Sequence, residues 1–337
     1  MRKGSIPQLL GLGVLFGGVA TVVALVVPWL PPDASKERDG IDLVFWFTTA
    51  IAIAVFALVM AVIAYSLLKF RAQPDDDSDG PPIHGHTGVE IVWTAIPAIL
   101  VTAISVISGI VLVQNDRADK NPLNVNVTAR QFAWTFTYPD QGNLTSATLH
   151  LPVNRSVVLH LTSLDVIHSF WVPEFGQKQD ALPGQDTKLV ITPTKNGTYP
   201  VICTELCGLG HAVMRTSAVV STPADFAAWV TQAKNEANGP PGQAGKTVFV
   251  NNGCASCHTL QAAAASGKVG PDLDKLPAYA TQAGKPLEDF IKQSIVDPNA
   301  YVQPGFPKNV MPSFQTLPAD QLNALVQFLV DSSKGTK

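Results

Sequence analysis

The sequence has few charged residues and few cysteines. Asp, Glu, Lys and Arg make up 15% of the 337 residues, the formal net charge is −3, and 46% of residues are hydrophobic. An intrinsically disordered chain is excluded, because it would combine low hydrophobicity with high charge. A nucleic-acid-binding protein is excluded too, since it would show a basic excess. Four cysteines are too few for a disulfide scaffold, and their placement indicates metal chemistry.

Three runs contain no charged residue at all: Gly4 to Pro32, Leu43 to Leu68 and Ile91 to Asn115. Each exceeds the ~20 residues that an α-helix needs to cross the hydrocarbon of a bilayer. The second and third runs predict a transmembrane helical hairpin over residues 41–116. Pro97 falls near the start of its helix, where a lost hydrogen bond matters least.

The first run leaves two interpretations open for residues 1–32, a signal peptide or an extra transmembrane helix. Arg2 and Lys3 precede an apolar stretch, as in a signal, but the stretch is longer than the 7–15 residues typical of one. Val22-Val23-Ala24 is a passable cleavage site. No cysteine lies nearby, which excludes a lipoprotein signal.

Basic residues near the ends of the runs set the orientation. Arg2 and Lys3 precede the first run, and Lys69 and Arg71 follow the second. The positive-inside rule places both clusters in the cytoplasm. We therefore expect a multi-pass protein of the bacterial cytoplasmic membrane, in contact with the lipid bilayer, with everything after Asn115 on the extracytoplasmic face.

The extracytoplasmic part divides by pattern. Residues 117–234 read as an all-β sandwich or small barrel with a closing helix from Pro223 to Ala237. Strands are expected around 125–128, 157–161, 188–191 and 218–220. Residues 235–245 form a linker by composition, around Asn-Gly-Pro-Pro-Gly-Gln. Residues 246–337 turn helical, most clearly from Pro318 to Val330.

A dense set of soft metal ligands occupies residues 203–214, which read Cys-Thr-Glu-Leu-Cys-Gly-Leu-Gly-His-Ala-Val-Met. Thiolate, thioether and imidazole groups suit copper. The thiolates of Cys203 and Cys207 can bridge two copper ions, and each ion then needs one nitrogen. His211 supplies one nitrogen, and His168 is the candidate for the other.

The alternative for Cys203 and Cys207 is a disulfide, since the compartment is oxidising. The scarcity of methionine favours a metal. Of the four methionines, Met1 is the initiator and Met60 lies in a membrane run, while Met214 and Met311 both stand where a ligand is wanted.

The second constellation is Cys254-Ala-Ser-Cys257-His258, the attachment signature of c-type haem. Two thiols bind the haem covalently and the adjacent histidine takes one axial position of the iron. Met311 is the only methionine downstream and is the expected second axial ligand. The alternative is a redox Cys-x-x-Cys pair.

Two resemblances follow from these motifs. The segment from Asp165 to Trp171 and the 203–214 motif resemble the dinuclear copper (CuA) region of cytochrome c oxidase subunit II, from about residue 42 to 222. The C-terminal part, with Gly270-Pro271 between Cys257 and Met311, resembles a fused class I cytochrome c, whose proline-bearing loop hydrogen-bonds the axial histidine. The implied fold is multidomain: a membrane hairpin, a cupredoxin-like β-sandwich, then an all-α cytochrome c.

The first resemblance also implies roles for the copper ligands. Cys203 and Cys207 would bridge the two coppers, and His168 and His211 would each bind one. Met214 would be a weak axial ligand. Glu205 would donate its backbone carbonyl, and its carboxylate would reach a magnesium shared with the catalytic subunit.

Two further roles rest on the same resemblance. Trp134, in the aromatic stretch from Gln131 to Tyr138, would match the tryptophan that passes electrons to copper, while Phe132 departs from a family in which another tryptophan is often found there. A packed core strand is the alternative. Glu90 would match a carboxylate at a proton-uptake entrance, the alternative being an acid favoured by a helix start.

The implied function is the electron-input subunit of a haem-copper cytochrome c oxidase, in which electrons pass from haem c to the dinuclear copper and on to subunit I for oxygen reduction coupled to proton pumping. Expected partners are subunit I, other oxidase subunits and a donor that is a cytochrome or a membrane complex. Three alternatives stay open: a copper-dependent nitric oxide reductase subunit, a copper-delivery protein and a free-standing membrane-anchored carrier.

Overall fold

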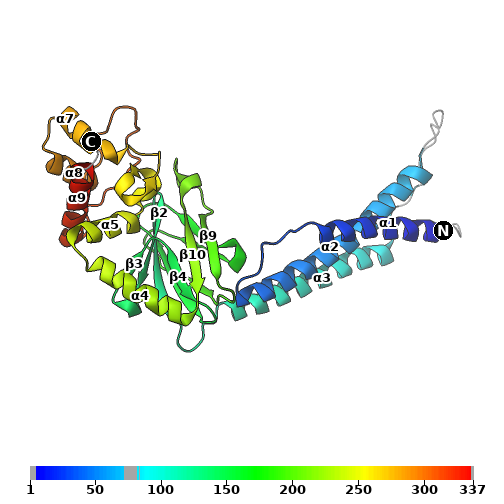
Figure 1. The fold of residues 1–337 in the computed structure, drawn as a ribbon. Helices are drawn as coiled ribbons and strands as arrows, with labels where there is room; N and C mark the ends of the chain where they lie inside the picture. The colour runs from blue at the N-terminus through cyan, green and yellow to red at the C-terminus, as the bar shows by residue number, and fades with distance from the viewer. Residues whose placement is uncertain (1–4, 72–81, 83, 335–337) are drawn as a thin grey trace. The chain divides into compact units, whose positions relative to one another are not determined.

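The computed structural model describes residues 5–71, 82 and 84–334 and divides into two compact units. One unit holds residues up to Pro32 and from Arg38 to Asn115, and the other holds Asp33–Glu37 and everything from Asp116 onward (Figure 1). Arg2 and Lys3, on which part of the predicted orientation depends, lie outside the described residues.

The first unit consists of three apolar helices, α1 (Ser5–Val26), α2 (Lys36–Lys69) and α3 (Thr87–Asn115). Each is long and apolar enough to cross a membrane, as predicted for the hairpin. A glycine lets α2 and α3 approach closely, because a Cβ on Gly40 would lie only 2.9 Å from the Val111 side chain. The Tyr65 hydroxyl bonds the Ser5 hydroxyl at 2.8 Å.

The helix α2 begins seven residues before the uncharged run at Leu43. Arg38 and Asp42 lie one turn apart and form an ion pair at 2.5 Å, which satisfies both charges within the helix. The hydrophobic run therefore marks the membrane-length part of α2, and the hydrogen-bonded helix extends beyond it.

Residues 123–221 form the predicted β-sandwich. One sheet has the strand order β3-β2-β1-β5-β8 and the other β4-β10-β9-β6-β7. Alternating residues of β1, such as Val125 and Val127, are fully buried between the sheets with Phe136 and Leu159. The strand bounds are β1 Leu123–Arg130, β2 Ala133–Tyr138, β3 Leu144–Ser146, β4 Leu149–Pro152, β5 Val157–Ser163, β6 His168–Trp171, β7 Lys178–Ala181, β8 Thr187–Ile191, β9 Gly197–Cys203 and β10 Arg215–Ser221.

The helix α4 (Pro223–Ala237) closes the sandwich, with the bounds that the sequence predicts. The Thr222 hydroxyl caps its first turn by accepting from the Asp225 amide at 3.2 Å. Its Trp229 packs edge-on against Tyr138 and stacks on His150, with ring centroids 5.1 Å and 4.0 Å away. These contacts fix α4 to the β-domain.

The C-terminal domain is mostly helical around a second core of buried side chains. Its elements are α5 Pro241–Asn251, α6 Cys254–Cys257, β11 Thr259–Leu260, β12 Ala265–Ser266, α7 Leu276–Gln282, α8 Leu287–Val296 and α9 Ala319–Lys334. The β11–β12 pair is an addition that the helical pattern did not predict. A Cβ on Gly245 in α5 would lie 2.1 Å from the Ala324 carbonyl oxygen of α9, so these two helices cross at the closest approach that glycine allows.

The Pro- and Gly-rich segment between the domains is more ordered than its composition predicts. The helix α4 ends at Ala237 and α5 begins at Pro241, which leaves only residues 238–240 between helices. Proline is well suited to a first helical position, because its missing amide has no partner there in any case.

Candidate metal and haem sites

Sheet pairing brings the predicted copper ligands together. The strand β6 begins at His168 and pairs with β9, so that Phe170 lies opposite Cys203. The chain then turns through Gly208 and Gly210 into a short 3-10 helix, His211–Val213, and Met214 precedes β10. Ligands from two strands and one loop thus converge at one end of the sandwich.

The distances describe two sulfurs, each beside one imidazole. The Cys203 sulfur lies 3.9 Å from the Cys207 sulfur and 3.9 Å from His168 Nδ1. The Cys207 sulfur lies 3.5 Å from His211 Nδ1 and 3.7 Å from the Met214 sulfur. The Glu205 backbone carbonyl is 3.3 Å from the Cys203 sulfur. Cys203, Cys207, His168 and Met214 are all buried.

The sulfur–sulfur distance decides against the disulfide. A disulfide bond is about 2.05 Å long, whereas these sulfurs are 3.9 Å apart and both cysteines are free. Ligand atoms of His168, Cys203 and Cys207 all lie within 4.8 Å of one another, a spacing that one metal ion can span. The donor set of thiolates, imidazoles and a thioether fits copper.

Asp165 fixes the orientation of His168. Its carboxylate lies 2.8 Å from His168 Nε2 and also accepts the Gln131 amide at 2.7 Å. The Nδ1 atom of His168 is thereby left facing Cys203. A carboxylate behind a ligating histidine fixes both the ring and its tautomer.

Burial and hydrogen bonding shift the pKa values of His168, Cys203 and Cys207 in different directions. Burial lowers the pKa of His168, but its hydrogen bonds with Asp165 and Cys203 outweigh burial and raise that pKa to about 8. Burial raises the pKa of Cys203, yet the hydrogen bond with His168 and nearby backbone groups bring it down to about 7. Burial and the neighbouring Cys203 thiolate raise the pKa of Cys207 to about 12.

An aromatic neighbour requires the glycines of the copper loop, which is the segment of residues 203–214 that carries most of the predicted copper ligands. A Cβ on Gly210 would lie 2.3 Å from the Phe132 ring, and one on Gly208 would lie 3.2 Å from it. Gly208 also has a φ of +127°, which side chains rarely adopt. The Gln131 side-chain amide donates to the Cys207 carbonyl. The turn between β1 and β2 therefore packs directly on the loop. Glu205 and Leu206 point outward and are exposed.

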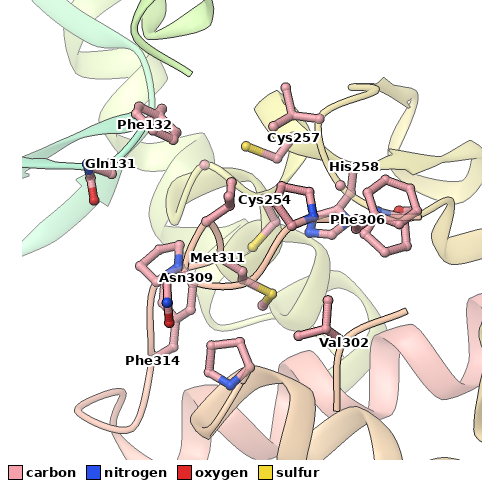
Figure 2. A pocket seen from close by; sticks show the side chains of 18 of the residues that line it. Gln131, Phe132, Cys254, Cys257, His258, Val302, Phe306, Asn309, Met311 and Phe314 are labelled. Atoms are coloured by element: carbon pink, nitrogen blue, oxygen red, sulfur yellow. The ribbon is translucent and has the colours of Figure 1, made fainter. Parts of the chain in front are cut away.

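The predicted haem residues line a single cavity (Figure 2). Cys254, Cys257, His258 and Met311 all line it. The His258 ring and the Met311 sulfur point into the same space. The two cysteines are free thiols, and burial raises the pKa of each.

His258 is held so that one ring nitrogen faces the cavity. Its Nδ1 lies 2.8 Å from the Pro271 carbonyl, the contact that the cytochrome c resemblance implied. Burial lowers the pKa of His258, and the bond to Pro271 opposes that shift. A Cβ on Gly270 would lie 2.4 Å from the ring. A neutral imidazole with a free Nε2, an opposed thioether and two free thiols fit covalently bound haem.

Trp134 and Glu90 lie elsewhere. Trp134 is buried, with its ring 6.1 Å from that of His168 and 5.6 Å from that of Phe170, and it belongs to the core of the sandwich. Among the described residues it is Phe132, rather than Trp134, that lines the haem cavity. In α3, the Glu90 carboxylate accepts the His86 amide at 3.1 Å, so it caps its own helix.

Sequence reasoning missed the β-domain's share of the haem cavity. Arg130, Gln131, Phe132 and Ala133 line it together with the cytochrome residues. The sequence distinguishes Phe132 only as a departure from the family pattern, and it does not indicate that Phe132 lies beside the haem cavity. No motif marks Arg130, because its place at the cavity depends on which surfaces meet after folding.

Family comparisons match all three parts of the chain. The models for the cytochrome c oxidase subunit II transmembrane domain, its periplasmic domain and cytochrome c match residues 21–110, 145–221 and 242–333. Cytochrome c oxidase subunit 2 of Synechocystis sp. is 35% identical over 64% of this chain and 80% of its own length. The subunit 2 of Alkalihalophilus pseudofirmus is 29% identical over 88% of this chain and 87% of its own.

Among solved structures, the periplasmic domain of subunit II of the cytochrome oxidase of Bradyrhizobium japonicum is 32% identical, covering 35% of this chain and 98% of that chain with a TM-score of 0.34. The matched domains follow the order of the described fold: apolar helices, β-sandwich and helical cytochrome c. The chain belongs to the cytochrome c oxidase subunit 2 family and carries a cytochrome c domain at its C-terminal end.

Proposed function

We propose that this chain is the electron-input subunit of a haem-copper cytochrome c oxidase, and that it passes electrons from haem c through a dinuclear copper centre to the catalytic subunit. Family membership supports the oxidase role. The observation that carries the proposal is the arrangement of two free, buried sulfurs 3.9 Å apart, each beside a different histidine.

This arrangement suits two coppers bridged by Cys203 and Cys207. His168 and His211 would each complete one ion, with Met214 and the Glu205 carbonyl as the further ligands. Bound copper of this kind supplies a redox centre with little structural rearrangement. The protein contributes a buried site whose ligands are oriented before the metal arrives, because Asp165 and the sheet pairing already hold His168.

The haem c site is proposed on Cys254 and Cys257 as covalent attachment points and on His258 and Met311 as axial ligands. Haem supplies the second redox centre, and methionine ligation raises its potential. Phe132 and Gln131 connect the two sites, since both line the haem cavity and both contact the copper loop. Trp134 remains a candidate for electron transfer because its ring packs edge-on against that of His168.

The remaining roles concern the membrane and the partners. The apolar helices would anchor the chain in a bacterial cytoplasmic membrane beside subunit I, with both redox domains on the extracytoplasmic face. The proposed domain organisation is a signal peptide or extra helix over 1–32, a transmembrane hairpin over 41–116, a dinuclear copper domain over 117–234, a linker over 235–245 and a cytochrome c domain over 246–337. The exposed Glu205 carboxylate would reach magnesium at the subunit I interface, and Glu90 would mark a proton entrance.

The test separates the two redox sites in the purified oxidase. Cys203→Ser should reduce bound copper from this subunit to near zero, measured by metal analysis, while covalent haem c stays at the wild-type level. Oxygen consumption with a reduced cytochrome should be lost. Thr204→Ser, on the same loop, is the control and should keep both cofactors.

Loss of copper and haem together would contradict the division into two sites. Purification without any haem-containing membrane subunit would instead favour a free-standing carrier. A complex that reduces nitric oxide but not oxygen would favour the reductase alternative.

A further inference from the structure

The haem cavity has a wall that belongs to the other domain. Residues 130–133, which are the last residue of β1, the two-residue turn and the first residue of β2, line it opposite the cytochrome residues. Figure 2 shows Gln131 and Phe132 on one side and Cys254, His258 and Met311 on the other. A cytochrome c domain that was joined to the β-domain by a flexible linker alone would not share the lining of this cavity with it.

Arg130 places a positive charge at this cavity. Its guanidinium carbon lies 4.8 Å from the centre of the Phe314 ring, three residues after Met311. Its Nε atom is buried and has no hydrogen-bond partner among the described residues. Burial lowers the pKa of Arg130, while Cys254 and Asp165 oppose that shift; arginine nevertheless stays charged in proteins. Asp165 is already bonded to His168.

Asn251, at the end of α5, anchors the two domains to each other. Its side-chain amide donates to the Thr145 carbonyl at 2.8 Å and its side-chain oxygen accepts the Ala147 amide at 3.2 Å. Its own carbonyl accepts the Thr135 hydroxyl at 3.1 Å. Two residues further on, a Cβ on Gly253 would lie 2.2 Å from that of Ala133. The surfaces therefore fit in one register.

We propose that the haem c site is completed by the β-domain, and that Arg130 is a positioning residue which raises the reduction potential of the haem only while Asn251 holds the domains docked. The inference rests on the proposed function of the two sites. Oxidised haem carries one more positive charge than reduced haem, so a nearby cation disfavours the oxidised form. The Nε atom of Arg130 is buried and its side chain is half-buried, which weakens the screening of this charge by solvent ions.

The test is a potentiometric titration of haem c in the purified holo-complex, with haem and copper contents measured on each variant. Arg130→Gln should shift the haem potential downward, and Arg130→Lys should restore most of the wild-type value. Arg155→Gln removes an exposed arginine that does not line the haem cavity and should leave the potential unchanged.

Asn251→Ala tests the docking. It should shift the potential in the same direction, and adding Arg130→Gln to it should produce little further change, because the charge has already left the cavity. An unchanged potential in Arg130→Gln, or fully additive shifts in the double variant, would overturn the inference. Absence of covalent haem in the wild-type chain would instead overturn the proposed haem site.

Discussion

Asp165 illustrates how a residue outside the proposed set of copper ligands can control the orientation of one of them. It lies behind His168 at 2.8 Å and accepts the amides of Gln131 and Val166, each at 2.7 Å. We predict that Asp165→Asn weakens copper binding about 10–100-fold, the usual cost of losing such a partner. Competition with a copper chelator measures the affinity. Asp186→Asn, which removes the charged partner of the half-buried His160, is the control, and equal affinities in the two variants would refute this role.

His150 gives the β-domain an acid-sensitive contact. Burial lowers its pKa to about 4, and its ring stacks on Trp229 at 4.0 Å. An unfolded histidine has a pKa of about 6.5, so the unfolded chain binds the proton more readily than the folded one below that pH. The stability contributed by neutral His150 is complete above about pH 6.5 and is lost as the pH falls towards 4.

His150→Phe keeps an aromatic stack but removes the titration. Between about pH 7 and about pH 5, the wild type should lose roughly 2 kcal/mol more unfolding free energy than this variant. Urea unfolding followed by tryptophan fluorescence at the two pH values measures the difference. An identical acid loss in both proteins would show that His150 is protonated as easily in the fold as outside it.

Single residues also show what a sequence can predict. The proposed metal and haem ligands could be singled out from the sequence because Cys, His and Met are rare here and their spacing is typical of coordination sites. Asp165, Arg130 and Asn251 could not, since each is an ordinary polar residue until a distant strand or domain is placed beside it. Asp165 contacts His168, Arg130 lies over the Phe314 ring, and Asn251 bonds Thr145.

Among the elements, the crossing of α5 and α9 is tightly constrained. A Cβ on Gly245 would come within 2.1 Å of a backbone oxygen at Ala324. We predict that Gly245→Ala destabilises the cytochrome domain by about 1–3 kcal/mol, because overlap with backbone outweighs the ~1 kcal/mol that alanine gains in helix propensity. The thermal midpoint of the change in the haem absorption spectrum of the holo-protein measures this loss of stability.

Gly242, in the same helix, provides the matched control. A Cβ there meets nothing within 4 Å, so Gly242→Ala should be neutral or stabilising by up to ~1 kcal/mol. If both alanine variants behaved alike, close packing of the two helices would not be the reason for glycine at position 245.

The elements were predicted best where periodicity was strong. The helix α4 and the principal strands fall where the pattern placed them. The start of α2 was not visible, because its first turns are charged and lie before the apolar run. The helical start of α5 was obscured by Pro241, a residue that interrupts a helix in its interior but suits its first turn.

At the scale of the whole molecule, docking predicts the kinetics of internal transfer. In the purified oxidase, photoreduced haem c should pass its electron to copper with first-order kinetics, and dilution should not change the rate constant, because donor and acceptor share one chain. Transient absorption at the haem and copper bands measures both partners. A rate that scales with protein concentration would mean that transfer occurs between molecules.

The segment of residues 238–240 joins one helix packed on the sandwich to another anchored through Asn251. Three extended residues reach only about 10 Å. In the proposed arrangement, a soluble cytochrome therefore competes for the copper with a haem that the same chain holds nearby and that cannot diffuse away. In the proposed arrangement the two redox centres act in series, so that an incoming electron is expected to enter at the haem and to reach the copper only from that haem.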